Sequence, residues 1–235
     1  MPCTKYLGIG LLLLLTACAT PKPQPETVDT AAPTEAPDSA TPDSATPAAP
    51  RPVTPNPYAA QPEPDDPAAR ALLLKANEAM AEQAWGKAEP LLLQAIAQAP
   101  EYSGIYYNLG RVYHQLNRPA EAMLRFQNAI AVNDKNIYAY NALAVLKREQ
   151  GDFSGAETLY KQALNIWPDH ADSHRNLGIL YDLYMGRLHE ALASYQAYQA
   201  LQEQPDRLVT AWIVDLERRL PAPSSELETT PVEAP

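Results

Sequence analysis

The sequence repeats itself with a period of 34 residues between about Ala69 and Asp206. A fixed period of this length predicts stacked copies of one small structural unit rather than one irregular core. The final step, from Ala156 to Ala191, is 35 residues. Four positions recur every 34 residues, and they carry small, branched or aromatic side chains. They are Ala88, Ala122 and Ala156; Leu92, Phe126 and Tyr160; Ala95, Ala129 and Ala163; and Leu109, Leu143 and Leu177.

The spacing inside one repeat predicts two helices that cross closely. Gly110 and Ala122 are small enough to lie at the crossing point, and the bulky Tyr113 and Phe126 fill the space beside it. The first helix has one face at the spacing i, i+3, i+4, i+7, made of Tyr106, Leu109, Gly110 and Tyr113.

At these residues the chain resembles the tetratricopeptide repeat family, whose pattern is an aromatic, Leu-Gly and Tyr on helix A, then Ala, Phe, Ala and Pro on helix B. The resemblance covers roughly 140 of 235 residues. It implies an all-α solenoid of about four helix-turn-helix units, with the A helices lining a concave face. The residues that match are Tyr106, Leu109, Gly110, Tyr113, Ala122, Phe126 and Ala129, and then Tyr140, Leu143, Ala144, Ala156, Tyr160, Ala163 and Pro168.

The register places the repeat domain at residues 68–204, with units at about 69–102, 103–136, 137–170 and 171–204. Within it we expect helices at 69–84, 87–99, 104–116 and 171–184, with Asn117 as the N-cap of the helix that begins near Pro119. Gly151 should stop one helix and Asp152 should cap the next. We expect the extra residue of the last unit to lengthen its turn at 185–187, and Tyr198, where a small residue is usual, to open or tilt this unit.

Residues 205–220 predict one further helix that caps the exposed face of the fourth unit. Its expected inner face consists of Leu208, Trp212, Ile213 and Leu216.

The first 17 residues have the features of an export signal. Leu7 to Leu15 form an apolar run that is too short to span a bilayer, and small residues lead into Cys18. This stretch resembles the lipobox of bacterial lipoproteins, which implies cleavage before Cys18, lipidation of its thiol and acylation with chains such as palmitate. Cys18 as an ordinary buried thiol is the alternative. Because Ala19 rather than Asp follows, the resemblance implies the outer membrane of a Gram-negative bacterium, facing the periplasm.

Residues 18–67 are rich in Pro, Ala and Thr and have no apolar face to bury, so we expect a disordered linker, either a spacer or a filler of no selected length. Residues 221–235 predict a disordered acidic tail. Much of the net charge of −10 lies in these segments, and no basic footprint for nucleic acid is present.

The sequence gives no sign of catalysis. No nucleophile, base and orienting acid stand at a recognisable spacing, and no glycine-rich phosphate loop occurs. His170 and His174 have the spacing of a metal clamp, but without a third ligand two solvated histidines are preferred. We therefore expect no enzyme, cofactor, metal or small-molecule substrate.

The A-helix positions that are not used for stacking predict a peptide-binding groove, which we expect to take an extended or helical peptide with acidic groups. Ordinary solvated side chains are the alternative. Some family members hold a C-terminal carboxylate in a Lys/Asn clamp, but Leu73, Tyr138 and Ala142 stand where the basic residues belong, although Asn77 and Asn108 match. The candidate groove residues are Asn77, Tyr107, Arg111, His114, Asn141, Arg148, Arg175 and Asp182.

The overall plan is similar to two groups of lipoproteins with tetratricopeptide repeats. One group helps secretins assemble in type IV pili, and the other recruits peptidoglycan hydrolases and proteases. The resemblance implies a membrane-anchored scaffold for envelope proteins, with pilus assembly as the preferred process. A periplasmic enzyme or direct cell-wall binder would need paired carboxylates on an aromatic platform, and no such pair is evident; a structural spacer without a specific ligand is the third alternative.

Overall fold

The computed structural model describes residues 54–59, 61 and 63–221. The predicted signal peptide 1–17, Cys18, the linker up to residue 53 and the tail from residue 222 lie outside the described residues.

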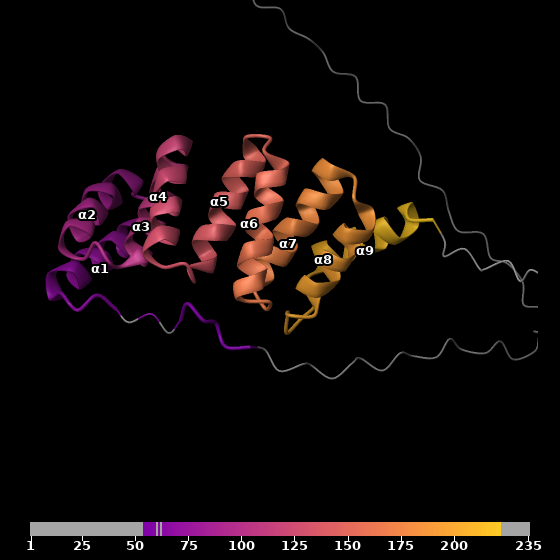
Figure 1. Ribbon diagram of the computed structural model, residues 1–235, viewed down its shortest axis with the longest axis horizontal. Helices are drawn as coiled ribbons and strands as arrows, with labels where there is room; N and C mark the ends of the chain where they lie inside the picture. The colour runs from indigo at the N-terminus through magenta and orange to yellow at the C-terminus, as the bar shows by residue number, and fades with distance from the viewer. Residues whose placement is uncertain (1–53, 60, 62, 222–235) are drawn as a thin grey trace, which may run out of the picture. The chain divides into compact units, whose positions relative to one another are not determined.

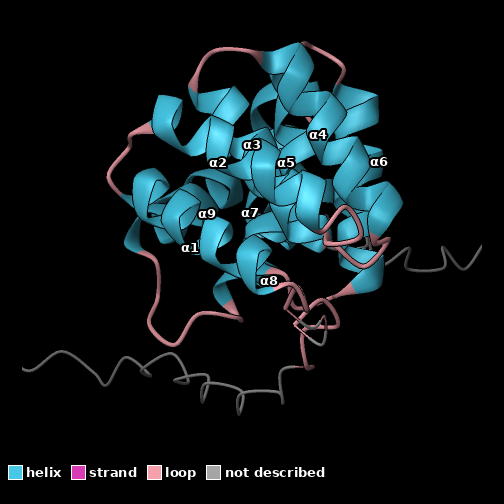
Figure 2. Ribbon diagram, turned by 90° about the vertical axis from the view of Figure 1, so that its left-hand side faces the viewer, coloured by secondary structure: helices cyan, strands magenta, loops and turns pink. Residues whose placement is uncertain are grey.

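Every regular element in the described part is a helix, and the helices follow one another in a row (Figure 1). Figure 2 looks along this row from the end that carries α1 and shows only helices and connecting loops. None of the described helices has the length and apolarity needed to cross a bilayer. The elements are α1 (Pro67–Ala81), α2 (Trp85–Gln98), α3 (Ser103–Gln115), α4 (Pro119–Val132), α5 (Ile137–Glu149), α6 (Phe153–Ile166), α7 (Ala171–Ile179), the π-helix η1 (Leu180–Met185), α8 (Leu188–Gln199) and α9 (Arg207–Arg219).

Consecutive helices pair as the 34-residue register predicts: α1 with α2, α3 with α4, α5 with α6, and α7 with α8. The repeated leucines Leu109, Leu143 and Leu177 are 0%, 4% and 6% exposed. These four pairs are called units one to four below, and α1, α3, α5 and α7 are their A helices. The predicted all-α repeat architecture is therefore confirmed.

A missing side chain allows each of two pairs to close tightly. A Cβ atom built on Gly110 would lie 2.5 Å from the Cε1 atom of Phe126, and one on Gly178 would lie 2.5 Å from the ring of Tyr195. Phe126 and Tyr195 are both 1% exposed. The aromatic ring of helix B thus lies directly against the backbone of helix A, at the position where the repeat carries a small residue.

Two predictions about helix ends have different outcomes. Asp152 caps α6, since its carboxylate accepts a hydrogen bond from the Gly155 amide at 2.9 Å, and Gly151 precedes it with φ of +81°. Asn117 is not the cap of α4, because it adopts a left-handed conformation with φ of 57° and Arg118 occupies the cap position. Asn tolerates this conformation better than most residues, so the residue suits a turn as well as a cap.

The extra residue of unit four lies inside a helix rather than in the turn. After Ile179 the helix widens into the π-helix η1, which ends at Gly186 with φ of 65°. A π-helix accommodates one inserted residue without breaking the helix. Tyr198, which stands where a small residue is usual, is 7% exposed, and its hydroxyl donates to the Asp206 carboxylate at 3.0 Å, so it packs against the start of α9.

The last helix α9 caps unit four, but its inner face is rotated from the predicted one. Leu208 is 59% exposed, whereas Val209 and Leu216 are fully buried. Trp212 packs with its ring centroid 5.3 Å from that of Tyr195. Asp206 caps the helix by accepting from the amides of Leu208 and Val209, which turns Leu208 outward.

The predicted linker ends earlier than residue 67. Thr54, Asn56, Tyr58 and Gln61 contact the repeats before α1 begins, and Pro64 is buried. In Figure 1 this segment is the indigo trace that runs beneath the helices into α1. The low apolar content that predicted disorder is offset here by hydrogen bonds and ring contacts of Thr54, Asn56 and Tyr58.

A partly exposed network of charged and polar side chains joins units three and four. One carboxylate oxygen of Glu157 in α6 accepts from the Lys161 ammonium at 2.6 Å, the Tyr181 hydroxyl at 2.8 Å and the Arg187 guanidinium at 2.9 Å. Burial opposes ionisation, but these three donors outweigh it and lower the pKa of Glu157 to about 2.

We predict that Gly110→Leu lowers the free energy of unfolding by about 1–3 kcal/mol, because the new side chain must displace the Phe126 ring. Thermal unfolding followed by circular dichroism measures the loss, at about 2–4 °C per kcal/mol for a domain of this size. Gly86→Ala is the matched control: a Cβ there meets nothing within 4 Å, so its melting temperature should be unchanged or higher. An unchanged Gly110→Leu curve would contradict the close helix crossing.

We predict that Glu157→Gln destabilises the protein at pH 7 and that the difference from the wild type shrinks below about pH 4.5. The folded pKa is below its unfolded value, so the stabilisation is present above the unfolded pKa and is lost as the pH falls toward about 2. Denaturant unfolding at a series of pH values measures this. Glu217→Gln, an exposed site on α9 with the same charge change, should show no such dependence; a constant gap for Glu157→Gln would refute the network.

Candidate peptide-binding groove

A row of pockets follows the A helices of units one to three. Three adjoining pockets form it: Asn77 lines the first and second, and Arg111 lines the second and third. We call this row of pockets the A-helix groove. Its lining residues on α1, α3 and α5 are Arg70, Leu73, Leu74, Asn77, Met80, Ala81, Asn108, Arg111, His114, Gln115, Asn141, Ala142 and Val145.

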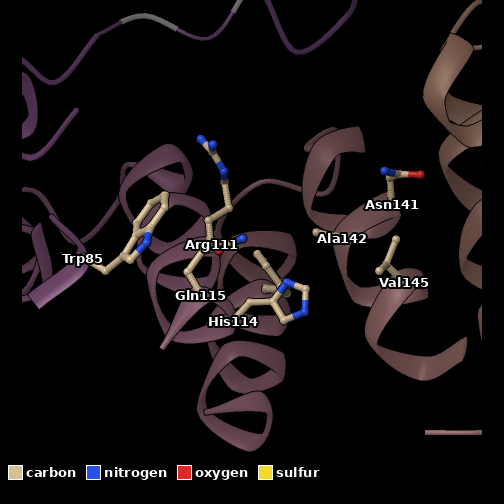
Figure 3. A pocket seen from close by; sticks show the side chains of 8 residues that line it. Trp85, Arg111, His114, Gln115, Asn141, Ala142 and Val145 are labelled. Carbon is tan, nitrogen blue, oxygen red and sulfur yellow. The ribbon is translucent and has the colours of Figure 1, made fainter. Parts of the chain in front are cut away.

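The third pocket, of about 210 Å³, lies between α3 and α5. Figure 3 shows Arg111, His114 and Gln115 projecting from α3, with Asn141, Ala142 and Val145 on α5 beside them and Trp85 on the other side. The pocket is therefore mixed in character: the aromatic and aliphatic groups offer apolar contact, and Arg111, Gln115 and Asn141 offer hydrogen bonds.

Arg111 is a groove cation available to an incoming group, as part of the lining of two pockets. It is exposed, and its guanidinium carbon lies 5.8 Å from the centre of the Tyr107 ring. Within residues 54–59, 61 and 63–221, no carboxylate forms an ion pair with it. The guanidinium has five N–H donors in a fixed plane, which suits bidentate contact with a carboxylate.

The other predicted polar residues of the groove are partly used within the protein. His114 Nε2 lies 3.2 Å from a carboxylate oxygen of Glu149. The Asn77 side-chain oxygen accepts from the amide of Asn108 at 3.0 Å, and that of Asn141 accepts from Asn176 at 3.1 Å.

Tyr107 and Arg148 contribute more to packing than to the groove surface. The Tyr107 ring lies 5.9 Å from that of Phe126 and 6.0 Å from that of Tyr138, and burial raises the pKa of its hydroxyl. The Arg148 guanidinium carbon lies 5.7 Å from the centre of the Tyr184 ring. Two of its nitrogens, Nε and Nη1, are buried with no hydrogen-bond partner among the described residues.

The structure places Arg175 and Asp182 at other contacts. Arg175 lies 3.6 Å from the carboxylate of Asp172 and 5.7 Å from the centre of the Tyr198 ring. The Asp182 side chain is 9% exposed and pairs with Arg219 of the capping helix at 2.9 Å. The capping helix therefore uses the unit-four end of the predicted surface, and the groove comprises units one to three.

Several groove residues were missed by the sequence reasoning. Trp85 begins α2, a B helix, so the register gave no reason to place it beside Arg111. Gln115 is a neighbour of a predicted position on α3, and Asn108 was recognised only as a match to the clamp pattern of some family members. The helical spacing of exposed positions provides a signal for these two residues, whereas the position of Trp85 depends on how α2 approaches α3.

The histidines differ from the expectation of two solvated side chains. His170 is 4% exposed, its Nδ1 lies 2.7 Å from the Ser173 hydroxyl, and burial lowers the pKa of its ring. His174 Nε2 lies 2.8 Å from the carbonyl oxygen of Pro168. Across the residues that the structure describes, no three His, Cys, Asp or Glu side chains gather as a metal site.

Two family models, both described as tetratricopeptide repeat, match the chain. One matches residues 79–146 and the other residues 136–204, so together they cover more than half of the chain. They overlap across the start of α5 and include every helix from α2 to α8.

Solved structures with the same fold support this match. The structure of pilF from Pseudomonas aeruginosa is similar with a TM-score of 0.59 and 19% identity, covering 65% of this chain and 68% of that one. That of YrrB, described as having an unusual peptide-binding site, is similar with a TM-score of 0.52 and 22% identity, covering 64% and 76%. At these identities the likeness shows the fold alone.

A curated relative is the protein O-mannosyl-transferase TMTC3 of Mus musculus, which is 30% identical over 133 residues. The match covers 50% of this chain but only 14% of the transferase, so the chain spans a small part of that protein's length. The match indicates shared helical repeats and carries no statement about catalysis.

Proposed function

Because the chain belongs to the tetratricopeptide repeat family, a fold that typically serves as a non-catalytic protein-binding scaffold, we propose that it is a lipid-anchored adaptor that assembles proteins of the bacterial envelope. The repeats supply the binding surface. The predicted signal peptide and Cys18 supply the anchor, which places the scaffold on the periplasmic side of the outer membrane.

The observation that carries the binding function is the row of adjoining pockets in the A-helix groove, with Arg111 shared by two of them. Arg111 links two pockets and forms no ion pair within the described part of the chain. Asn77 and Asn108 lie at one end and the apolar Val145 lies at the other. This arrangement suits an extended peptide with an acidic side chain over Arg111, amide contacts on one side and an apolar residue on the other.

Assembly of a type IV pilus or its secretin is the envelope process that we propose first. The similarity of plan to pilus-assembly lipoproteins supports it, and the fold similarity to pilF of Pseudomonas aeruginosa agrees with it. Recruitment of peptidoglycan hydrolases or proteases uses the same groove chemistry and is the alternative that partner identification decides.

We predict that Cys18→Ala abolishes lipidation and releases the protein from the membrane fraction. Several acyl chains hold a protein firmly, at about 0.8 kcal/mol per buried CH₂, so their loss should move the protein to the soluble fraction. Metabolic labelling with a fatty-acid analogue and membrane fractionation measure both effects. Cys3→Ala, which changes the other cysteine, is the control and should remain labelled; label on Cys18→Ala would disprove the anchor.

We predict that a photo-crosslinking amino acid at Gln115 captures envelope proteins in intact cells and that Arg111→Glu lowers the yield about tenfold. The reversal replaces an attraction with a repulsion across the groove, worth on the order of 1.4 kcal/mol or more. Mass spectrometry identifies the captured proteins and distinguishes pilus components from hydrolases.

Two controls define the outcome. Lys87→Glu makes the same charge change at an exposed position of α2 outside the groove lining and should leave the yield unchanged. A crosslinker at Gln127, exposed on α4, should capture none of these proteins. Equal yields from Gln115 and Gln127, or an equal effect of the two reversals, would exclude the groove as the site.

A further inference from the structure

The segment before α1 lies across three units of the repeat domain. Thr54 contacts the junction of units three and four, 115 residues away in sequence, whereas Tyr58 and Gln61 contact Ser103 at the start of unit two. In a repeat array each unit normally contacts only its neighbours. We call residues 54–59 and 61 the strap. The strap makes long-range contacts across the repeat domain that the repeats alone do not make.

The strap is held by contacts to specific side chains. The Thr54 amide and hydroxyl donate to one Asp169 carboxylate oxygen at 2.5 and 2.6 Å, and the Thr54 carbonyl accepts from the Trp167 indole N–H at 2.9 Å. The Asn56 side-chain amide donates to the Tyr138 hydroxyl at 2.9 Å. The amide, hydroxyl and carbonyl groups of Thr54 therefore each have a hydrogen-bond partner in the repeats.

Tyr58 occupies a place that the repeats leave open. Its ring meets that of Tyr138 edge to face at 5.6 Å, and its hydroxyl lies 3.3 Å from the Ser103 hydroxyl. A Cβ atom on Gly104 would lie 3.2 Å from the Tyr58 hydroxyl, so the absence of a side chain at this position makes room for it. Burial raises the pKa of Tyr58.

The surface under the strap contains buried polar groups. Ser103 is fully buried and Asp169 is 3% exposed. Asn136, also fully buried, donates to the Ser103 hydroxyl at 2.9 Å and so fixes this group toward Gln61 and Tyr58. We call this surface the strap site, and it consists of Ser103, Asn133, Tyr138, Trp167 and Asp169.

The strap itself has the properties of a peptide ligand. Thr54, Asn56 and Tyr58 contact the repeats through hydrogen bonds and a ring contact, while Pro55 is exposed. Pro57 lies in a turn closed by the Ala59 amide and the Asn56 carbonyl at 3.1 Å. Proline fixes the backbone angle φ before binding, so little conformational entropy is lost on docking.

We propose that the strap site is a second peptide-binding site, separate from the A-helix groove, and that its ligand is the chain's own Thr-Pro-Asn-Pro-Tyr segment. The short connection to α1 keeps the segment at a high local concentration, on the order of millimolar. The site is therefore filled in the intact chain and accepts the same peptide from outside only when the chain's own segment is weakened.

The test uses the full chain and the indole N–H signal of Trp167 in a nuclear magnetic resonance spectrum. The sequence has three tryptophans, so Trp167→Phe identifies the signal. The triple variant Thr54→Ala, Asn56→Ala, Tyr58→Ala should shift this signal and speed its exchange with water. A synthetic peptide of residues 52–63 should restore the wild-type position in the triple variant, and should bind the wild-type chain at least tenfold more weakly.

The controls separate recognition from a general effect. The same peptide with Tyr58→Ala should not restore the signal, and the full-chain variant Ala59→Ser, at an exposed strap position, should leave it unchanged. A Trp167 signal that is unaffected by the triple variant would overturn the proposal, as would equal peptide binding by the variant and the wild type. Failure of the peptide to restore the signal would also overturn it, whatever the A-helix groove binds.

Discussion

The contact between a small residue on helix A and an aromatic ring on helix B determines most of this structure. Gly110 and Phe126 approach so closely that no Cβ fits between them, and Gly178 and Tyr195 repeat the arrangement. In these two pairs the contact sets the distance between the helices and buries a large aromatic ring, whereas unit one carries Leu92 at the same position of helix B. Because the pairs stack one after another, the A helices of units one to three lie next to one another and line the adjoining pockets of the A-helix groove.

The repeat period made the pairing and the buried positions predictable. Residues such as Leu109 and Leu143 recur at a spacing that only a stacked helix pair explains, and they are buried as expected. The period says less about local irregularities. The π-helix η1 accommodates the extra residue of unit four while the neighbouring helices stay packed. The left-handed conformation of Asn117 does the same for the tight turn between α3 and α4.

The residues that line the groove were only partly predictable, because some of them depend on how distant elements approach one another. Register positions say which side chains leave the A helix on the open side, and Arg111 and His114 were found in this way. The register does not say which side chains meet a later element. Asp182 is bound by Arg219 from α9, and Trp85 enters from a B helix, so both depend on tertiary approach. The strap gave no apolar pattern at all, since polar contacts to Tyr138 and distant parts of the chain hold it.

Hydrogen exchange on the chain with and without a captured partner tests most directly whether the A-helix groove is the binding surface. Binding there predicts slower exchange of the backbone amides of α3 and α5, centred on Arg111 and Asn141, and no change in α4 and α6. Protection confined to α4 and α6, or to α9, would contradict binding through the A helices.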